Sequence, residues 1–180
     1  MDKISGEWAG HGSLRILSVS GNKFKNLGLV KNCPALQELY LGNNQVATLG
    51  GCEGGLPSLK RLHLRRNKIQ TIEDELPEMP ELTYINLRHN NLDSMENAVK
   101  IFQFPKIVDL NVVNNPIDLN ASSFNLLMAE FILKRSALVR FCKHTVKESN
   151  KLEAVHLAQY RWNIEEEKRK AALAAGNVEE

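Results

Sequence analysis

Arginine, histidine and tyrosine are the side chains of this sequence with the most capacity for chemistry, and they concentrate in two neighbouring segments. Arg61, His63 and Arg65 alternate along the first segment, and Tyr84 and Arg88 follow in the second. A guanidinium group forms paired hydrogen bonds with carboxylates and phosphates. Arg and Tyr also contribute much of the binding energy at protein interfaces. These residue types therefore indicate recognition of a partner rather than catalysis of a reaction.

The sequence offers little support for an enzyme, a metal centre or a cofactor site. The glycine-rich run at 50–55, GGCEGG, lacks the Lys-Ser/Thr ending that gives a phosphate-binding loop its chemistry. Cys142 and His144 lie close together but have no second pair of metal ligands beside them. No activating base stands next to Cys33 or Cys52, which we interpret as packing residues. We therefore predict a non-enzymatic protein without cofactor or metal.

The elements that must position these side chains are copies of one eleven-residue pattern, L-x-x-L-x-L-x-x-N-x-I. Five copies occur, at 14–24, 36–46, 59–69, 82–92 and 107–117. Their first positions fall 22, 23, 23 and 25 residues apart. Self-similarity at this period is the signature of a leucine-rich-repeat solenoid.

Within each copy, the apolar residues at positions one, four and six direct one side of a short strand inward. The Asn at position nine follows the strand, where a short amide can bond backbone groups that no strand pairs. One coil cannot bury its apolar face alone, so neighbouring coils must stack on a shared core. The predicted fold class is α/β: a leucine-rich-repeat solenoid with a short parallel β-sheet on the concave face and helical turns on the convex face. Among the returning segments, 94–104 is the best candidate for a true α-helix, and the others are expected to form helical turns or 3₁₀ segments.

The repeats divide the chain into four predicted parts: a partial N-terminal repeat at 1–13, five repeats at 14–117, a C-terminal cap at 118–144, and a long charged helix with its tail at 145–180. Ile4 precedes Leu14 by ten residues, as Leu49 precedes Leu59, so it occupies the back half of an incomplete coil. We expect upstream sequence or a partner at this end, because an uncovered strand edge promotes aggregation. The alternative is a cap improvised by Trp8 and its neighbours.

The cap is predicted to contain a helix that starts at Asn120, Ser122 or Ser123. Its apolar face recurs at three- and four-residue spacing in Phe124, Leu127, Met128, Phe131 and Ile132. Leu138 and Phe141 then repeat the start of a coil. An element of this kind covers the exposed end of a solenoid core.

The final segment is predicted to form one helix from Val146 to about residue 175, introduced by the capping pattern of residues 145–148, TVKE. About 30 residues without Pro or Gly correspond to a helix of about 45 Å. One stripe of this helix carries Leu152, Val155, Gln159 and Trp162, whereas Leu157 and Ile164 lie off it. A helix that extends beyond the domain it caps must rest on a partner or stand in solvent.

The side chains at positions three, five and seven of each strand are expected to face outward across the concave sheet, where Arg66 and His89 join the residues introduced above. The predicted partner-binding residues are Tyr40, Arg61, His63, Arg65, Tyr84 and Arg88 on this face, and Trp162 on the long helix. The alternative for each is a solvated polar position, since few interface residues contribute strongly. The same arginines could bind RNA phosphates, but Glu38 and Asp109 flank the patch, and we do not expect nucleic acid as the principal partner.

Composition limits the remaining possibilities. The chain has 180 residues, 43% hydrophobic and 24% charged, which suits one soluble domain. Its net charge of +2 does not by itself indicate nucleic acid or an anionic membrane. No apolar run approaches the roughly 18 residues of a membrane span, and the first residues lack the apolar core of a secretory signal. The 3 scattered cysteines indicate a reducing intracellular compartment and therefore the cytoplasm.

Several motifs resemble the SDS22-like class of intracellular leucine-rich-repeat proteins, namely LQELYL, LKRLHL and LTYINL, followed by VNNPI and an LVRF cap. The resemblance covers nearly residues 14–144. Members of this class include a nuclear phosphatase regulator, the spliceosomal partner of the U2 small nuclear ribonucleoprotein, and axonemal proteins of cilia. The resemblance implies a non-enzymatic scaffold, and it leaves open a phosphatase regulator or a component of an RNA–protein particle.

A narrower resemblance concerns the stretches 59–92 and 138–170, which are similar to consecutive repeats and to the cap and charged helix of the leucine-rich-repeat protein family of ciliary radial spokes. It implies a structural subunit of the cilium or flagellum axoneme, bound at the head region of a radial spoke. Other axonemal proteins would be its partners, with no membrane contact. That family carries further repeats upstream, and its helix is shorter than the one predicted here.

Overall fold

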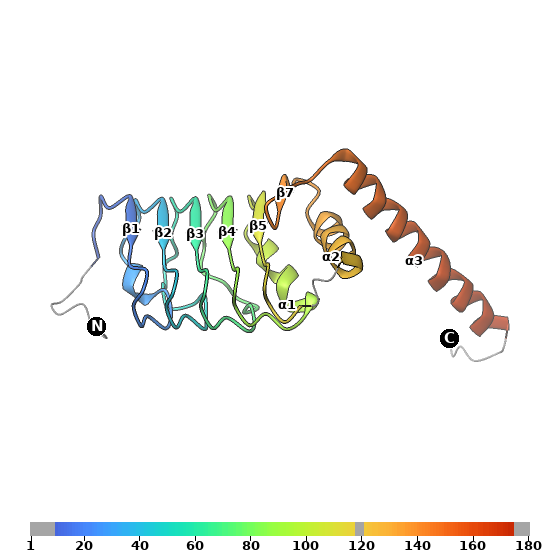
Figure 1. Ribbon diagram of the computed structural model, residues 1–180, viewed down its shortest axis with the longest axis horizontal. Coiled ribbons are helices and arrows are strands. Elements are labelled where there is room, and N and C mark those ends of the chain that lie inside the picture. Colours follow the sequence, from blue (N-terminus) through green and yellow to red (C-terminus); the bar gives the residue numbers. More distant parts are fainter. Residues whose placement is uncertain (1–9, 118–120, 175–180) are drawn as a thin grey trace.

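The computed structural model describes residues 10–117 and 121–174, apart from the side chains of 121–124 and 174, and forms an elongated solenoid (Figure 1). Five short strands stand side by side: β1 (Ile16–Ser18), β2 (Glu38–Tyr40), β3 (Arg61–His63), β4 (Tyr84–Asn86) and β5 (Asp109–Asn111). The predicted roles of Ile4, Trp8 and Asn120, and of the side chains of Ser122, Ser123 and Phe124, fall outside the described part.

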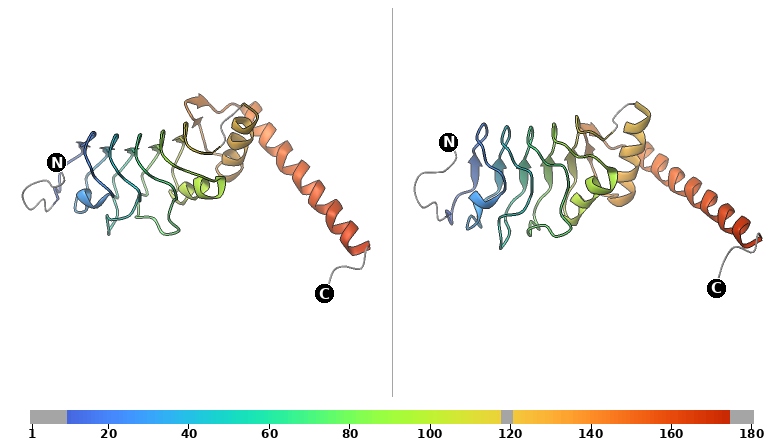
Figure 2. Two further views of the ribbon diagram at one scale, coloured as in Figure 1. Left: turned by 60° about the horizontal axis from the view of Figure 1, so that its bottom comes forward. Right: turned by 90° about the horizontal axis from the view of Figure 1, so that it is seen from below.

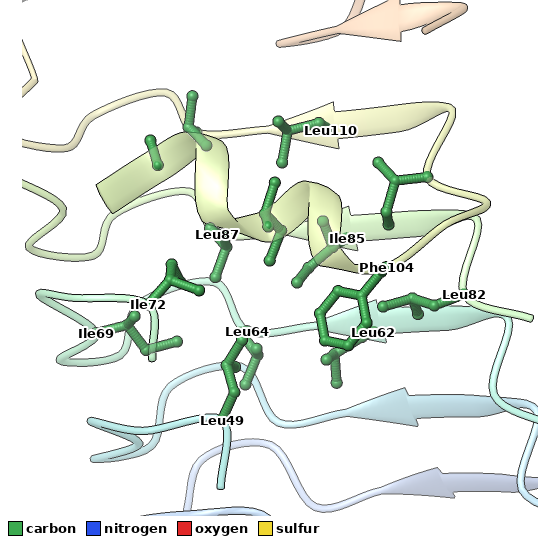
Figure 3. Close-up of a cluster of buried hydrophobic side chains, with 14 of the residues drawn as sticks. Leu49, Leu62, Leu64, Ile69, Ile72, Leu82, Ile85, Leu87, Phe104 and Leu110 are labelled. Atoms are coloured by element: carbon green, nitrogen blue, oxygen red, sulfur yellow. The ribbon is translucent and has the colours of Figure 1, made fainter. Parts of the chain in front are cut away.

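The strands follow one another across the sheet in chain order, and neighbouring strands from β1 to β5 are parallel. The register places equivalent repeat positions together: Leu39 lies opposite Leu62, and Ile85 lies opposite Leu110. All four side chains are fully buried. Figure 3 shows inward side chains of β3 and β4 meeting those of the returning segments, including Phe104. The predicted α/β leucine-rich-repeat solenoid is confirmed.

The Asn at position nine lies just beyond the strand and hydrogen-bonds to two coils at once. Asn67 Nδ2 donates to the Leu64 carbonyl of its own coil and to the Leu41 carbonyl of the preceding coil, at 2.9 Å each. Its Oδ1 accepts a hydrogen bond from the backbone N–H of Val46, also at 2.9 Å. Asn90 repeats this arrangement one coil further. The predicted bonding to turn backbone is confirmed, and the structure adds that these bonds join neighbouring coils.

The returning segments on the convex face differ from one another. Residues 94–104 form α1 (Met95–Val99), which continues as the 3₁₀ helix η2 (Lys100–Gln103), and the first return contains the 3₁₀ helix η1 (Gly28–Val30). Residues 49–56 contain one hydrogen-bonded turn, in which the Gly55 N–H donates to the Cys52 carbonyl at 2.9 Å, but no helix or 3₁₀ segment. The helical turn expected at 72–79 is wrong, because this segment is a bend and irregular backbone. Gly55 has a φ of +72°, and a Cβ there would lie 2.4 Å from the Glu78 carbonyl oxygen. In the third return, Pro77 has no N–H and disfavours a helical conformation at Leu76.

A helix covers the end of the solenoid core. Helix α2 (Ala121–Lys134) buries the predicted residues Leu127, Met128, Phe131 and Ile132. Arg135, which follows it, donates from its guanidinium to the carbonyls of Phe102 at 2.8 Å and Pro105 at 2.5 Å. These bonds satisfy carbonyl groups at the end of η2 and fix the cap to the last return.

The sheet continues into the cap as a small hairpin. Strand β6 (Arg140–Phe141) is parallel to β5, and β7 (His144–Thr145) runs back antiparallel to β6. Leu138 and Phe141 are buried, so the predicted start of a further coil is confirmed. The two residues of the turn, Cys142 and Lys143, have φ values of 50° and 73°, which suit the primed turns that join two-residue hairpins.

The long helix α3 (Glu148–Ala174) contains 27 residues, which corresponds to about 40 Å. It begins two residues later than predicted, and the capping role proposed for Thr145 is wrong because that residue belongs to β7. The Lys147 N–H instead donates to Asn150 Oδ1 at 3.0 Å. The first half of α3 packs against α2, and the helix then diverges from the solenoid (Figures 1 and 2). Over the described residues, no helix is long and apolar enough to cross a membrane.

Candidate partner-binding surface

The outward side chains of β2, β3 and β4 form an aromatic column. The rings of Tyr40 and His63 stack with centroids 4.3 Å apart and an interplanar angle of 18°. His63 also contacts Tyr84, with ring centroids 4.8 Å apart. The parallel register brings these residues together, since Tyr40 lies opposite His63, and Arg61 lies opposite Tyr84. The guanidinium carbon of Arg61 lies 4.4 Å from the centroid of the Tyr84 ring.

Polar contacts fix the protonation states along this column. The Tyr40 hydroxyl donates to Glu38 Oε2 at 2.5 Å, and this bond, together with burial, raises the pKa of Tyr40. Burial and the charge of Arg61 lower the pKa of His63. A phenol and an imidazole shifted in these directions are neutral at pH 7. The three rings are therefore uncharged and ordered, and they lie beside the guanidinium group of Arg61 and the carboxyl group of Glu38.

The start of the strands carries charges of both signs. Glu38 begins β2 and Asp109 begins β5, whereas Arg61 begins β3 and Arg140 begins β6. Burial raises the pKa of Asp109, although Arg140, 3.7 Å away, and Arg61 oppose this effect. The carboxylates here have cationic or hydroxyl neighbours on the same surface, and so they are compensated internally.

The other end of the strands has a basic character. Arg65, Arg66, Arg88 and His89 lie in the turns that follow β3 and β4, and we call these four residues the basic ridge. In the described part of the chain, no carboxylate lies within ion-pair distance of the three arginines. Desolvation and the charges of Arg88, Arg65 and Arg66 lower the pKa of His89. The ridge therefore presents positive charge that the surrounding protein does not neutralise.

A shallow depression of about 200 Å³ borders the basic ridge and is lined by Ser20, Gly42, Asn43, Arg65 and Arg66. Position seven of the first two coils carries the small residues Ser20 and Gly42, whereas Arg65 and Arg88 occupy it in the next two. The sequence reasoning missed this depression. The signal that could have found it is the pair of small residues beside large ones at the same repeat position.

The structure brings six of the seven predicted binding residues onto one face. Tyr40, Arg61, His63, Tyr84, Arg65 and Arg88 all project from β2 to β4 or from the turns that follow them. Trp162 does not join them, because it lies on α3, on the far side of α2 from these strands (Figures 1 and 2). Arg88 is half-buried, and its Nε is enclosed without a partner, so it is less free than the pattern predicted.

Trp162 belongs to a separate exposed stripe on α3. Leu152, Val155 and Trp162 are 59%, 58% and 59% exposed. The opposite side of the helix carries the buried Ala154 and the half-buried Leu157, and Arg161 forms an ion pair with Glu130 of α2. Helix α3 thus uses one face for the cap and presents the predicted stripe to solvent.

The thiol groups are poorly suited to nucleophilic chemistry. Burial raises the pKa of Cys52 and of Cys142 to about 11, so the reactive thiolate is scarce at neutral pH. All three cysteines are buried and free. Across residues 10–117 and 121–174, no group of three or more His, Cys, Asp or Glu side chains could hold a metal ion.

Comparisons with known proteins agree with this architecture. A family model described as leucine rich repeat matches residues 57–117, and one described as leucine rich repeats (2 copies) matches 13–51 and 34–78. The chain is therefore a leucine-rich-repeat protein. A chain of the crystal structure of the Drosophila melanogaster SNF/U2A′ complex is similar, with a TM-score of 0.65 and 23% identity over 78% of this chain and 79% of that one. No curated protein matches the sequence.

Proposed function

We propose that this protein is a non-enzymatic scaffold that docks protein partners on its concave face. The observation that carries the proposal is the ordered surface formed by Tyr40, His63 and Tyr84 with Arg61, adjoining the basic ridge. Aromatic rings and arginines fixed on a rigid sheet lose little conformational entropy on binding.

The assembly we propose is the axoneme of a cilium or flagellum, with the protein bound at the head region of a radial spoke. The support is the resemblance, set out in the sequence analysis, of the motifs in residues 59–92 and 138–170 to the radial-spoke family. In this proposal the protein resides in the cytoplasm and the axoneme, and its partners are other spoke subunits. The exposed stripe of α3, with Trp162, forms a second contact surface.

A second candidate is a component of an RNA–protein particle, and two observations favour it. The fold resembles a chain of the SNF/U2A′ complex, and the basic ridge has no internal counter-charge. The aromatic faces argue against it, because Tyr40 is stacked on His63, and Tyr84 lies under Arg61. Bases need free aromatic faces for stacking. A phosphatase regulator of the SDS22-like class would also use a protein-binding concave face, and it stays open as a third assignment.

The test is cross-linking mass spectrometry on the protein captured from ciliated cells, with an Arg65→Glu and Arg88→Glu double variant beside the natural sequence. We expect cross-links from Lys147, Lys151 and Lys168 to spoke-head subunits. Charge reversal should remove the partner contacts of the concave face, and circular dichroism will show whether the variant is folded.

Three results would contradict the proposal. Unchanged partner contacts in a folded double variant would rule out the concave face. Absence from axonemes would rule out the spoke assignment. Cross-links to a ribonucleoprotein, with a steep loss of affinity as salt rises, would favour the RNA–protein particle.

A further inference from the structure

We propose that the basic ridge binds an acidic segment of a protein partner, one rich in Asp or Glu, that lies across the ends of β2, β3 and β4. The inference rests on the proposed function and specifies the partner's chemistry. Arg65, Arg66 and Arg88 supply the cations, and the depression beside Arg65 receives a carboxylate side chain.

The first step is the crowding of positive charge at the ridge. The backbone N–H of Arg66 donates to the Arg88 carbonyl at 2.9 Å, so Arg65, Arg66 and Arg88 lie on two adjacent turns. Within the described chain none of the three has a carboxylate at ion-pair distance, whereas Lys100 binds Asp74 and Arg161 binds Glu130. Like charges held together repel one another, and a bound anion would relieve that repulsion.

The second step is a backbone feature at position eight. This position is left-handed in every coil, with φ of 74° at Gly21, 58° at Asn43, 58° at Arg66, 55° at His89 and 59° at Asn114. Gly, Asn and His are the residues that adopt this conformation most readily. Arg66 is the exception, because its coil carries a less favourable residue there, and that residue adds a positive charge to the ridge.

The third step is shape. The depression of about 200 Å³ lies where Gly42 and Ser20 leave space beside Arg65 and Arg66. Its lining consists of the two arginines, Asn43 and the small residues Ser20 and Gly42. A carboxylate bound there would lie beside two residues whose guanidinium groups can bind it through paired hydrogen bonds.

The fourth step distinguishes a protein segment from a nucleic acid. A long polyanion lying along the concave face would meet charges of both signs at the start of the strands, where Arg61 lies between Glu38 and Asp109, whereas the ridge at the other end carries positive charge alone. The aromatic rings next to the ridge already contact neighbouring side chains. The geometry thus favours a short anionic segment that crosses only the carboxyl ends of the strands.

The test uses a fluorescein-labelled peptide of ten glutamates, with fluorescence anisotropy at about 50 mM salt, where surface charges are weakly screened. The diagnostic variant is Arg66→Asn, and the matched control is Lys68→Asn, which removes one positive charge two residues away. We expect Arg66→Asn to weaken binding about tenfold, as for loss of a charge-assisted hydrogen bond. The control should stay within about twofold, as expected for a charge outside the contact.

Thermal unfolding of the same variants separates binding from folding. Asn suits the left-handed position, so Arg66→Asn should keep or raise the melting temperature while it weakens binding. A lower melting temperature would make Arg66 a structural residue and overturn the inference. Equal binding by Arg66→Asn and the natural sequence would also overturn it.

A single-stranded RNA of ten nucleotides serves as the competing probe. Tighter binding of this RNA, lost in Arg66→Asn, would assign the ridge to nucleic acid instead. If the glutamate peptide does not bind but Arg65→Glu with Arg88→Glu still removes partner contacts in cells, the acidic-segment inference fails and the proposed function stands.

Discussion

The side-chain amide of the Asn at position nine forms hydrogen bonds with several backbone groups in this solenoid. Asn44, Asn67 and Asn90 are at most 8% exposed, and each donates to carbonyls of two coils and accepts from a backbone N–H of the preceding coil. Buried backbone groups left without partners are costly. The polar core of the molecule is therefore a column of amides beside the apolar column.

Replacing Asn67 with Ala should destabilise the fold by about 2–4 kcal/mol. The Val46 N–H loses its partner, which costs about 1–3 kcal/mol, and the Leu41 and Leu64 carbonyls each lose one hydrogen bond but keep those from Asn44 and Asn90. Urea unfolding followed by circular dichroism measures the loss. The matched control is Asn22→Ala, since Asn22 in the first coil donates only to Val19 and Ser20 of its own coil. That change should cost less than about 1 kcal/mol. Equal losses at the two sites would show that bonding between coils is not the source of the effect.

At the residue scale, the sequence predicted which face of the sheet each side chain points to, but it did not predict which side chains contact one another. Alternation was enough to place Arg61, His63 and Tyr84 on the outward face, because side chains on a strand change sides at every residue. Which of them contact one another depends on register and rotamer. The stacking of Tyr40 on His63 and the hydrogen bond to Glu38 were therefore beyond the pattern.

At the scale of elements, the repeat pattern predicted the strands, but it did not predict the conformation of the returning segments or the start of α3. The strands recur wherever the pattern recurs, since their apolar residues share one core. The returns lack a common pattern: the glycine-rich segment 50–55 forms a single turn without a helix, and the segment around Pro77 forms no helical turn. The start of α3 also differed from its capping pattern, because the β6–β7 hairpin incorporates Thr145. Strand β6 of this hairpin pairs with β5, where Asp109 lies opposite Arg140, and a local capping motif does not reveal pairing with a strand so far away in the chain.

Two truncations should separate the halves of α3. Ending the chain after Thr145 removes the packing of Ala154 and Leu157 on the cap and should lower the melting temperature by about 3–8 °C, corresponding to about 1–3 kcal/mol. Ending it after Glu165 keeps that packing and should leave the melting temperature within about 2 °C. Differential scanning calorimetry of both proteins checks this. A large loss on removing 166–180 would mean that the outer half of α3 also supports the fold.

At the scale of the whole molecule, the two candidate surfaces lie apart, so they should act independently. Trp162→Ala should weaken contacts made by α3 and leave those of the concave face, whereas Arg65→Glu with Arg88→Glu should do the reverse. Effects at separated sites add when they share no neighbours. Quantitative cross-linking of the single and combined variants measures both sets of contacts. Loss of both sets in Trp162→Ala alone would show one continuous interface.

Because the strands follow one another in chain order, distances along the solenoid are multiples of one coil spacing. Each coil occupies one strand spacing of about 4.8 Å, and the bonds made by position-nine Asn repeat from coil to coil. Gain or loss of one whole coil between the basic ridge and α2 would therefore shift α3 relative to the ridge by one such step without rebuilding either end. The number of coils therefore sets the distance between a partner bound at the ridge and a partner bound on α3. Evolution can change this distance only by adding or removing whole coils.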